Sequence, residues 1–224
     1  MAEERFAERA AKQRDTAILR SLLASFNEHG CFETTLDQVA ADVGIGKGTL
    51  YRHYSSREDL FEAALQAGIE GLIVRCHGIW GAHAPDFDAA LRVLIGELVS
   101  LNHRGDPLSP ATLARLCCGC RWLSPGRREE GKLEVAFTPL VRGWQAVGLF
   151  ERTTDPSWIA AVTLALVNSL AVTRHGSQEV VEPSVTSTRP RSPASEADIA
   201  SRIVGVLRRA FAPTLQSTTA VTGR

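Results

Sequence analysis

The chain has 224 residues with 25 basic and 25 acidic side chains, so its formal net charge at pH 7 is zero. Residues 1–60 carry eight Lys or Arg against ten Asp or Glu, which excludes a polybasic protein that coats nucleic acid through bulk charge. No run of about 18 apolar residues predicts a membrane span, and the charged first residues do not suit a signal peptide. We therefore expect a cytoplasmic protein with a small domain and a larger one.

The first predicted element is a helix over about residues 10–29, because apolar side chains recur at helical spacing from Ile18 to Phe26 and Gly30 follows. We expect this helix to pack over the next two. Four basic residues near its start would add to a local positive patch, and these are Arg5, Arg9, Lys12 and Arg14.

Residues 35–54 predict two short helices joined by a glycine turn, which is a helix-turn-helix. Thr35 is a suitable N-cap for the first of them, and Gly44 ends it. In the second helix, Leu50 and Tyr54 lie four residues apart and form a face for burial. The polar remainder of that helix would face outward, where a partner can reach it.

The outward residues suit the major groove of DNA. Gly46 and Gly48 leave the leading end of the second helix without bulk, so its backbone can come close to DNA. A cation, hydroxyls and backbone amides would hold the phosphates on either side. Any one of these side chains alone is more often a solvated surface residue, and only the spacing of the whole block favours DNA contact. The candidate DNA-binding residues are Thr35, Gln38, Gly46, Lys47, Gly48, Thr49, Tyr51, Arg52, His53 and Arg57.

This block resembles the DNA-binding segment of the tetracycline-repressor (TetR) family of bacterial one-component regulators. The resemblance covers about the first quarter of the chain and rests on Thr35, Val39-Ala40, Gly44-Ile45, Lys47-Gly48-Thr49-Leu50-Tyr51, Tyr54, Ser56-Arg57-Glu58 and Leu60. Tyr54 stands where the family usually has Phe, and Arg57 stands where Lys is commoner. The family resemblance implies a repressor that dimerises on a palindromic DNA operator and is released by a small-molecule effector.

The rest of the chain is also predicted to be helical, because no segment shows the alternation of a strand. Ser56 and Asp59 begin a long fourth helix with an apolar stripe. Further helices are predicted over residues 87–103, 110–122, 129–147 and 155–173, and a last one begins at Ser195. We expect an all-α protein of about nine helices, with an N-terminal three-helix DNA-binding domain over residues 1–56 and a C-terminal helical domain for ligand binding and dimerisation over residues 57–213. Residues 175–194 contain three X-Pro bonds and predict a mobile loop, and residues 214–224 predict a frayed tail.

An effector cavity among the central helices is implied by the resemblance. Aromatic walls with few polar groups would suit a flat or greasy molecule, although core packing is the alternative for each residue alone. The candidates are Trp80, Phe87, Cys117, Trp122, Phe137 and Trp144. Nothing in these residues specifies the effector or the operator, or distinguishes a repressor from an activator.

Three cysteines lie close together in sequence. Cys117 and Cys120 share a helical face, Cys118 points elsewhere, and no fourth zinc ligand is near. Core packing is favoured over thiol sensing and over metal binding. We expect no metal site and no cofactor, and all five cysteines reduced.

The helix that begins near Asp155 is apolar nearly all round, which exceeds what one domain core needs. With the last helix it is predicted to form the homodimer interface, and the alternative is a buried central helix in a monomer. The candidate interface residues are Val162, Leu166, Leu170, Ile203, Val206 and Leu207.

Two other classes of protein remain as alternatives. An enzyme is disfavoured, because the chain lacks a Gly-x-Ser-x-Gly motif, a phosphate-binding glycine loop and a paired-histidine zinc motif. A helical adaptor or sensor that kept the fold without operator binding is the second alternative.

Overall fold

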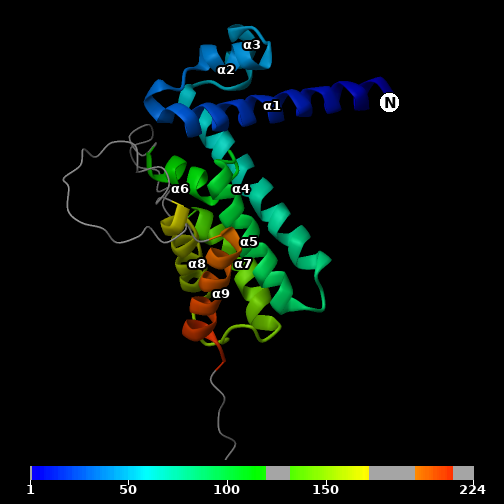
Figure 1. Ribbon diagram of the computed structural model, residues 1–224. Coiled ribbons are helices and arrows are strands. Elements are labelled where there is room, and N and C mark those ends of the chain that lie inside the picture. Colours follow the sequence, from blue (N-terminus) through cyan, green and yellow to red (C-terminus); the bar gives the residue numbers. More distant parts are fainter. Residues whose placement is uncertain (1, 120–131, 172–194, 214–224) are drawn as a thin grey trace, which may run out of the picture.

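The computed structural model describes residues 2–119, 132–171 and 195–213 (Figure 1). Within these ranges the chain forms nine α-helices and no strand, which confirms the predicted all-α class. The helices are α1 (Ala2–Glu33), α2 (Leu36–Val43), α3 (Lys47–His53), α4 (Arg57–Ala82), α5 (Phe87–Arg104), α6 (Pro110–Gly119), α7 (Lys132–Ala146), α8 (Pro156–Ala171) and α9 (Glu196–Phe211). None of the described helices combines the length and the hydropathy that a membrane span needs.

The first three helices and the start of α4 enclose a small apolar core. Leu22 and Phe26 of α1 are buried there with Leu50 of α3 and Phe61 of α4. The rings of Phe26 and Phe61 meet edge to face, with their centroids 6.2 Å apart. In Figure 1, α2 and α3 lie above α1, whereas α5 to α9 lie below it. The core therefore holds α2 and α3 on the outer side of the molecule.

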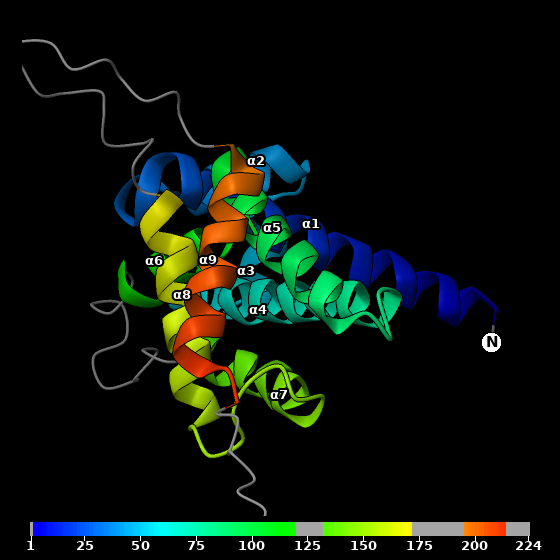
Figure 2. The same ribbon diagram turned by 60° about the horizontal axis from the view of Figure 1, so that its bottom comes forward.

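Helix α1 is longer than predicted. It begins at Ala2, and in both views its N-terminal half projects from the rest of the molecule (Figures 1 and 2). Apolar spacing could not reveal this half, which lies outside the core, but its Ala, Glu and Arg residues favour a helix. The predicted stop is confirmed, because Gly30 has non-helical angles (φ 78°, ψ 179°) within the span.

The larger part of the molecule is built around α5, which packs against α4, α8 and α9. Leu91, Leu94 and Ile95 of α5 are fully buried. Helix α7 packs on α8, and α6 lies beneath α1 (Figure 1). Helix α4 runs from the small core into this larger part and so belongs to both.

Helix starts in the larger part follow the predicted capping residues. Ser195 and Asp198 form a reciprocal capping box at the start of α9. Asp155 accepts hydrogen bonds from the backbone N–H and the hydroxyl of Ser157, at 2.9 and 2.8 Å, just before α8. Helix α5 ends at Arg104, one residue later than predicted, and a left-handed Gly105 caps it. The predicted loop over residues 175–194, the tail over 214–224 and the helix ends predicted within 120–131 and 172–173 lie outside the described residues.

Candidate nucleic-acid interface

The turn between α2 and α3 is fixed by backbone hydrogen bonds. Gly44 has φ 72°, a left-handed conformation that favours glycine, and its N–H donates to the Ala41 carbonyl at 3.0 Å. The N–H of Ile45 donates to the Ala40 carbonyl at 2.9 Å. At the other end of α2, the Thr35 hydroxyl accepts from the Gln38 N–H at 3.3 Å. Thr35 and Gly44 therefore cap α2 as their residue types predict.

Helix α3 presents most of its polar residues to solvent. Leu50 is buried and Tyr54 is half-buried against the core, so these two hold the inner face. Thr49 and Arg57 are half-buried, whereas the other predicted DNA-binding residues are exposed. We call the exposed set the α2–α3 surface, and it comprises Thr35, Gln38, Gly46, Lys47, Gly48, Tyr51, Arg52 and His53.

Two glycines on the α2–α3 surface are not required by the packing of the chain. Gly46 has an ordinary φ of −70°. A Cβ atom added at Gly46 or at Gly48 would meet no atom within 4 Å. The missing side chains therefore leave open space on the outside of the protein, which is where a close-approaching partner would need it.

Lys47 is paired within the protein. Its Nζ lies 2.7 Å from Oδ1 and 2.9 Å from Oδ2 of Asp37, and 5.9 Å from the centre of the Tyr51 ring. The hydrogen bond with Asp37 raises the pKa of Lys47, and burial opposes this only in part. Sequence reasoning missed Asp37, which lies ten residues away in the first turn of another helix, α2.

Arg57 has a partner inside the protein. Its Nη2 donates to the Thr34 carbonyl at 2.8 Å, and its guanidinium lies 5.3 Å from the centre of the Phe61 ring. The hydrogen bond with Thr34 fastens the start of α4 to the junction between α1 and α2, whereas Phe61 lies on α4 itself. A contact between Arg57 and a DNA phosphate stays a prediction.

Residues 18–64, from the middle of α1 to the first turns of α4, match the model of the family described as bacterial regulatory proteins, tetR family. This segment therefore carries the DNA-binding region of the TetR family. Among curated proteins, the nucleoid occlusion factor SlmA of Escherichia coli (strain K12 / DH10B) is 25% identical over 177 residues, covering 76% of this chain and 85% of SlmA. TetR-family proteins are DNA-binding transcriptional regulators, which confirms the predicted class of function.

Solved structures extend the likeness to the whole fold. A transcriptional regulator from Rhodococcus sp. Rha1 superposes with a TM-score of 0.64 at 19% identity, covering 88% of this chain and 97% of that one. A TetR family transcription regulator from Marinobacter aquaeolei VT8 gives 0.61 at 16% identity, covering 92% and 98%. The likeness therefore includes the C-terminal helices as well as the helix-turn-helix.

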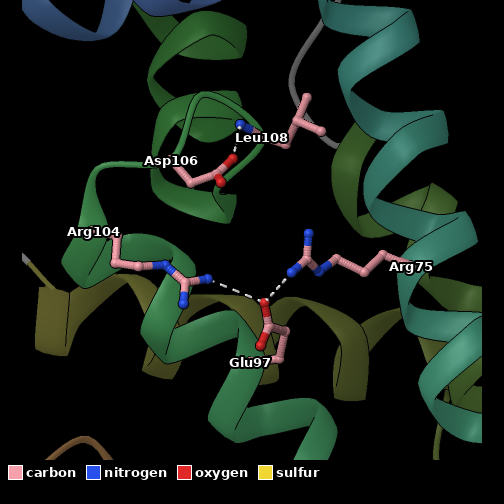
Figure 3. A network of polar contacts seen from close by, with 5 residues as sticks. All are labelled: Arg75, Glu97, Arg104, Asp106 and Leu108. Atoms are coloured by element: carbon pink, nitrogen blue, oxygen red, sulfur yellow. Dashed lines mark hydrogen bonds and ion pairs between the residues drawn. The ribbon is translucent and has the colours of Figure 1, made fainter.

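An ion-pair network ties α4 to α5 (Figure 3). Oε1 of Glu97 on α5 lies 2.6 Å from Nη2 of Arg75 on α4 and 3.2 Å from Nη2 of Arg104. Figure 3 shows the Glu97 carboxylate between the two arginines. We call α1 to α3 with the start of α4 the DNA-binding unit, and the remaining helices the larger part. The network holds α4, which leads to the DNA-binding unit, against α5 at the centre of the larger part.

Aromatic side chains form a continuous cluster beside the inner end of α4. Trp80 stacks on Phe87 with centroids 5.1 Å apart, and Trp144 of α7 lies 6.3 Å from Trp80. Phe150 and Phe211, which sequence reasoning did not select, continue the contacts at 5.7 and 6.2 Å. We call these five residues the aromatic cluster. Trp144 is fully buried, and its Nε1 has no hydrogen-bond partner among the described residues.

The other candidate pocket residues lie apart from these contacts. Phe137 of α7 and Cys117 of α6 are buried in the core. Trp122 lies outside the described residues, as do Cys120 and the side chains of Cys31 and Cys118. Burial raises the pKa of the Cys76 thiol to about 12, so this cysteine stays protonated at neutral pH.

The predicted dimer interface needs a correction. Ile203 and Leu207 are buried inside the chain, so a partner does not reach them. Helix α9 has one apolar stripe, and that stripe serves the core of the chain itself, where α9 packs on α5 and α8. Val206 is 39% exposed, and Val162 and Leu166 are half-buried. The side chain of Leu170 lies outside the described residues.

Proposed function

We propose that the protein is a homodimeric repressor that binds a palindromic operator and leaves it when a small-molecule effector binds the larger part. The course of α4 carries this proposal. This helix begins at Arg57 beside the DNA-binding unit and reaches Trp80 in the aromatic cluster, so one continuous element contacts both regions.

DNA would meet the α2–α3 surface. Lys47, Arg52 and the hydroxyls of the surface supply donors for phosphates, and the two bare glycine positions allow close approach. One such unit has no excess of positive charge, because residues 1–60 carry eight Lys or Arg against ten Asp or Glu. Two units on half-sites about one helical turn apart would therefore be needed for tight binding.

The second copy would pack on α8. Its Trp158 is 59% exposed, and Val162, Ala165 and Leu166 follow along the same side of the helix. Val206 of α9 adds an exposed apolar residue. An apolar stripe of this kind on a soluble chain favours burial against another copy.

The effector would bind at the aromatic cluster. Its rings favour a largely apolar, flat molecule, and the unpartnered Trp144 Nε1 favours one that carries a hydrogen-bond acceptor. Binding there would shift α4 and with it the separation of the paired DNA-binding units.

Fluorescence anisotropy with duplexes from the DNA that flanks the gene tests this function. We expect saturable binding of two chains per site, with competition by unlabelled duplex of the same sequence but not by unrelated duplex. Absence of any sequence-dependent binding would favour the adaptor alternative. Ligand screening by thermal shift would follow, and any ligand that binds but leaves operator affinity unchanged would contradict release by an effector, because coupling is reciprocal.

A further inference from the structure

The ion pair between Lys47 and Asp37 lies on the surface that meets DNA. We propose that Asp37 is a specificity-determining residue, which occupies Lys47 so that the protein binds DNA of arbitrary sequence weakly. The inference rests on the proposed contact of Lys47 with DNA. Asp37 lies within the helix-turn-helix but is not among the DNA-binding residues predicted from the sequence.

The geometry makes the pairing close and local. Both carboxylate oxygens of Asp37 lie within 2.9 Å of Lys47 Nζ. The two residues are carried by different helices, whose positions are fixed by buried Leu36 and Val39 on α2 and Leu50 on α3. The pair is therefore part of the folded surface and does not need DNA to form.

The pair is also open to exchange. The side chains of Lys47 and Asp37 are 56% and 65% exposed, and ion pairs in solvent are weak. A DNA group in the right position can thus take over the ammonium. The carboxylate stays where it is and continues to repel phosphates that approach without such a fit.

The consequence for DNA of arbitrary sequence follows from counterion release. A lysine that contacts a phosphate contributes about −0.9 to the slope of log K against log salt. Lys47 contributes less while Asp37 cancels its charge, so the nonspecific footprint shrinks by about one charge per subunit. At the operator, base-edge contacts by other residues of the α2–α3 surface hold the duplex in register, and Lys47 can exchange its partner.

The experiment compares Asp37→Asn with the original chain. Anisotropy is measured with a labelled 30-bp duplex of randomised sequence and with an operator selected from a random library by the original protein, each from 50 to 300 mM KCl. We expect Asp37→Asn to raise affinity for the randomised duplex by about fivefold for each bound subunit at 0.15 M salt. The slope of log K against log salt should steepen by about 0.9, also for each bound subunit. Operator affinity should rise less, so the ratio of the two affinities falls.

Asp42→Asn is the matched control. It removes the same charge from the same helix, and Asp42 is exposed like Asp37. The Asp42 carboxylate differs in its partner, because it accepts a hydrogen bond from the Ser21 hydroxyl at 3.2 Å. We expect a smaller effect from it. An equal effect would overturn the inference, because general charge would then suffice. Thermal unfolding checks the fold of each variant, and Asp37→Ser serves if Asp37→Asn does not fold.

A double-mutant cycle separates this inference from the proposed DNA contact. If Asp37 acts mainly through Lys47, the effect of Asp37→Asn on affinity for the randomised duplex is much smaller when Lys47→Ala is also present. Should Lys47→Ala alone change neither the affinity for the operator nor its salt slope, the proposed DNA contact is wrong. Should Lys47→Ala weaken binding while Asp37→Asn leaves the randomised duplex unchanged, the contact stands and the role of Asp37 is wrong.

Discussion

The side chain of Asn27 on α1 accepts a hydrogen bond from the hydroxyl of Thr112 on α6 at 2.8 Å. The amide nitrogen of Asn27 donates to the Gly105 carbonyl at 2.8 Å, and Arg115 donates to the Asn27 side-chain oxygen. The guanidinium of Arg115 lies 5.7 Å from the centre of the Phe26 ring. The DNA-binding unit is therefore joined to the larger part through α1 and α6 as well as through α4.

Asn27→Ala tests the strength of this junction. The substitution removes the hydrogen bonds that Asn27 makes with the Gly105 carbonyl, the Thr112 hydroxyl and Arg115, so we expect a loss of about 1–3 kcal/mol in the free energy of unfolding. Urea unfolding followed by tryptophan fluorescence measures it. Gln13→Ala, on the exposed part of α1, is the control and should change stability little. Equal stability of the two variants would show that the junction contributes nothing.

Gly48→Ala should change stability and DNA binding in opposite directions. Alanine favours a helix by about 0.5–1 kcal/mol over glycine, and no atom in the described part of the chain lies within 4 Å of the new Cβ. If DNA approaches the backbone there, affinity for the selected operator should fall by about tenfold, or about 1.4 kcal/mol.

Gly78→Ala is the control for this change. Gly78 lies within α4, is exposed and also has no atom within 4 Å of an added Cβ. It should gain stability without losing operator affinity. A Gly48→Ala protein that binds the operator as tightly as the original would show that DNA does not approach this point.

The dimer face is tested by placing a charge on it. We expect Leu166→Glu and Val206→Glu to be monomeric in sedimentation velocity, because each would bury a carboxylate near its copy across the symmetry axis. Operator affinity should be lost although α3 is unchanged. Val74→Glu, at a site on α4 that is 70% exposed, should remain dimeric. A dimeric Leu166→Glu protein would move the interface away from α8.

Acid should weaken the attachment of α9 to α5. The pKa of Glu196 is lowered, first by a hydrogen bond from Ser100 and then by His103, whose Nδ1 lies 3.3 Å from Oε1. A lowered pKa in the folded state stabilises the protein above the unfolded-state value, and this contribution is lost as the pH falls through the folded-state pKa. Glu196→Gln should therefore be less stable than the original at pH 7, with the difference closing below about pH 4. A difference that is constant with pH would contradict this.

Local rules predicted what depends on neighbours in sequence. The caps at Thr35 and Ser195 and the turn at Gly44 follow from residue type and spacing, and the structure has all three. The recognised block around Lys47 was identified in the same way, and the family comparison confirms it.

Sequence reasoning failed where the answer depends on which helix, in the same chain or in a second copy, packs against an apolar face. The periodicity of α9 indicates an apolar stripe, but it does not say whether the same chain or a second copy buries Ile203 and Leu207. Asp37 was missed for a related reason, because its contact with Lys47 exists only once two helices have packed. The extended start of α1 escaped because a helix outside the core has no burial pattern.

The position of Arg75 along α4 has a geometric consequence. At 1.5 Å per residue, Arg75 is about 27 Å from Arg57 but only about 7.5 Å from Trp80. If α4 tilts as a rigid rod about its attachment to Glu97, a displacement of 1 Å at the inner end becomes one of about 3.6 Å, in the opposite direction, at the start of the helix. Under the proposed function, such a tilt would turn a small movement of an aromatic ring into a displacement large enough to affect how two helices fit into successive grooves of DNA.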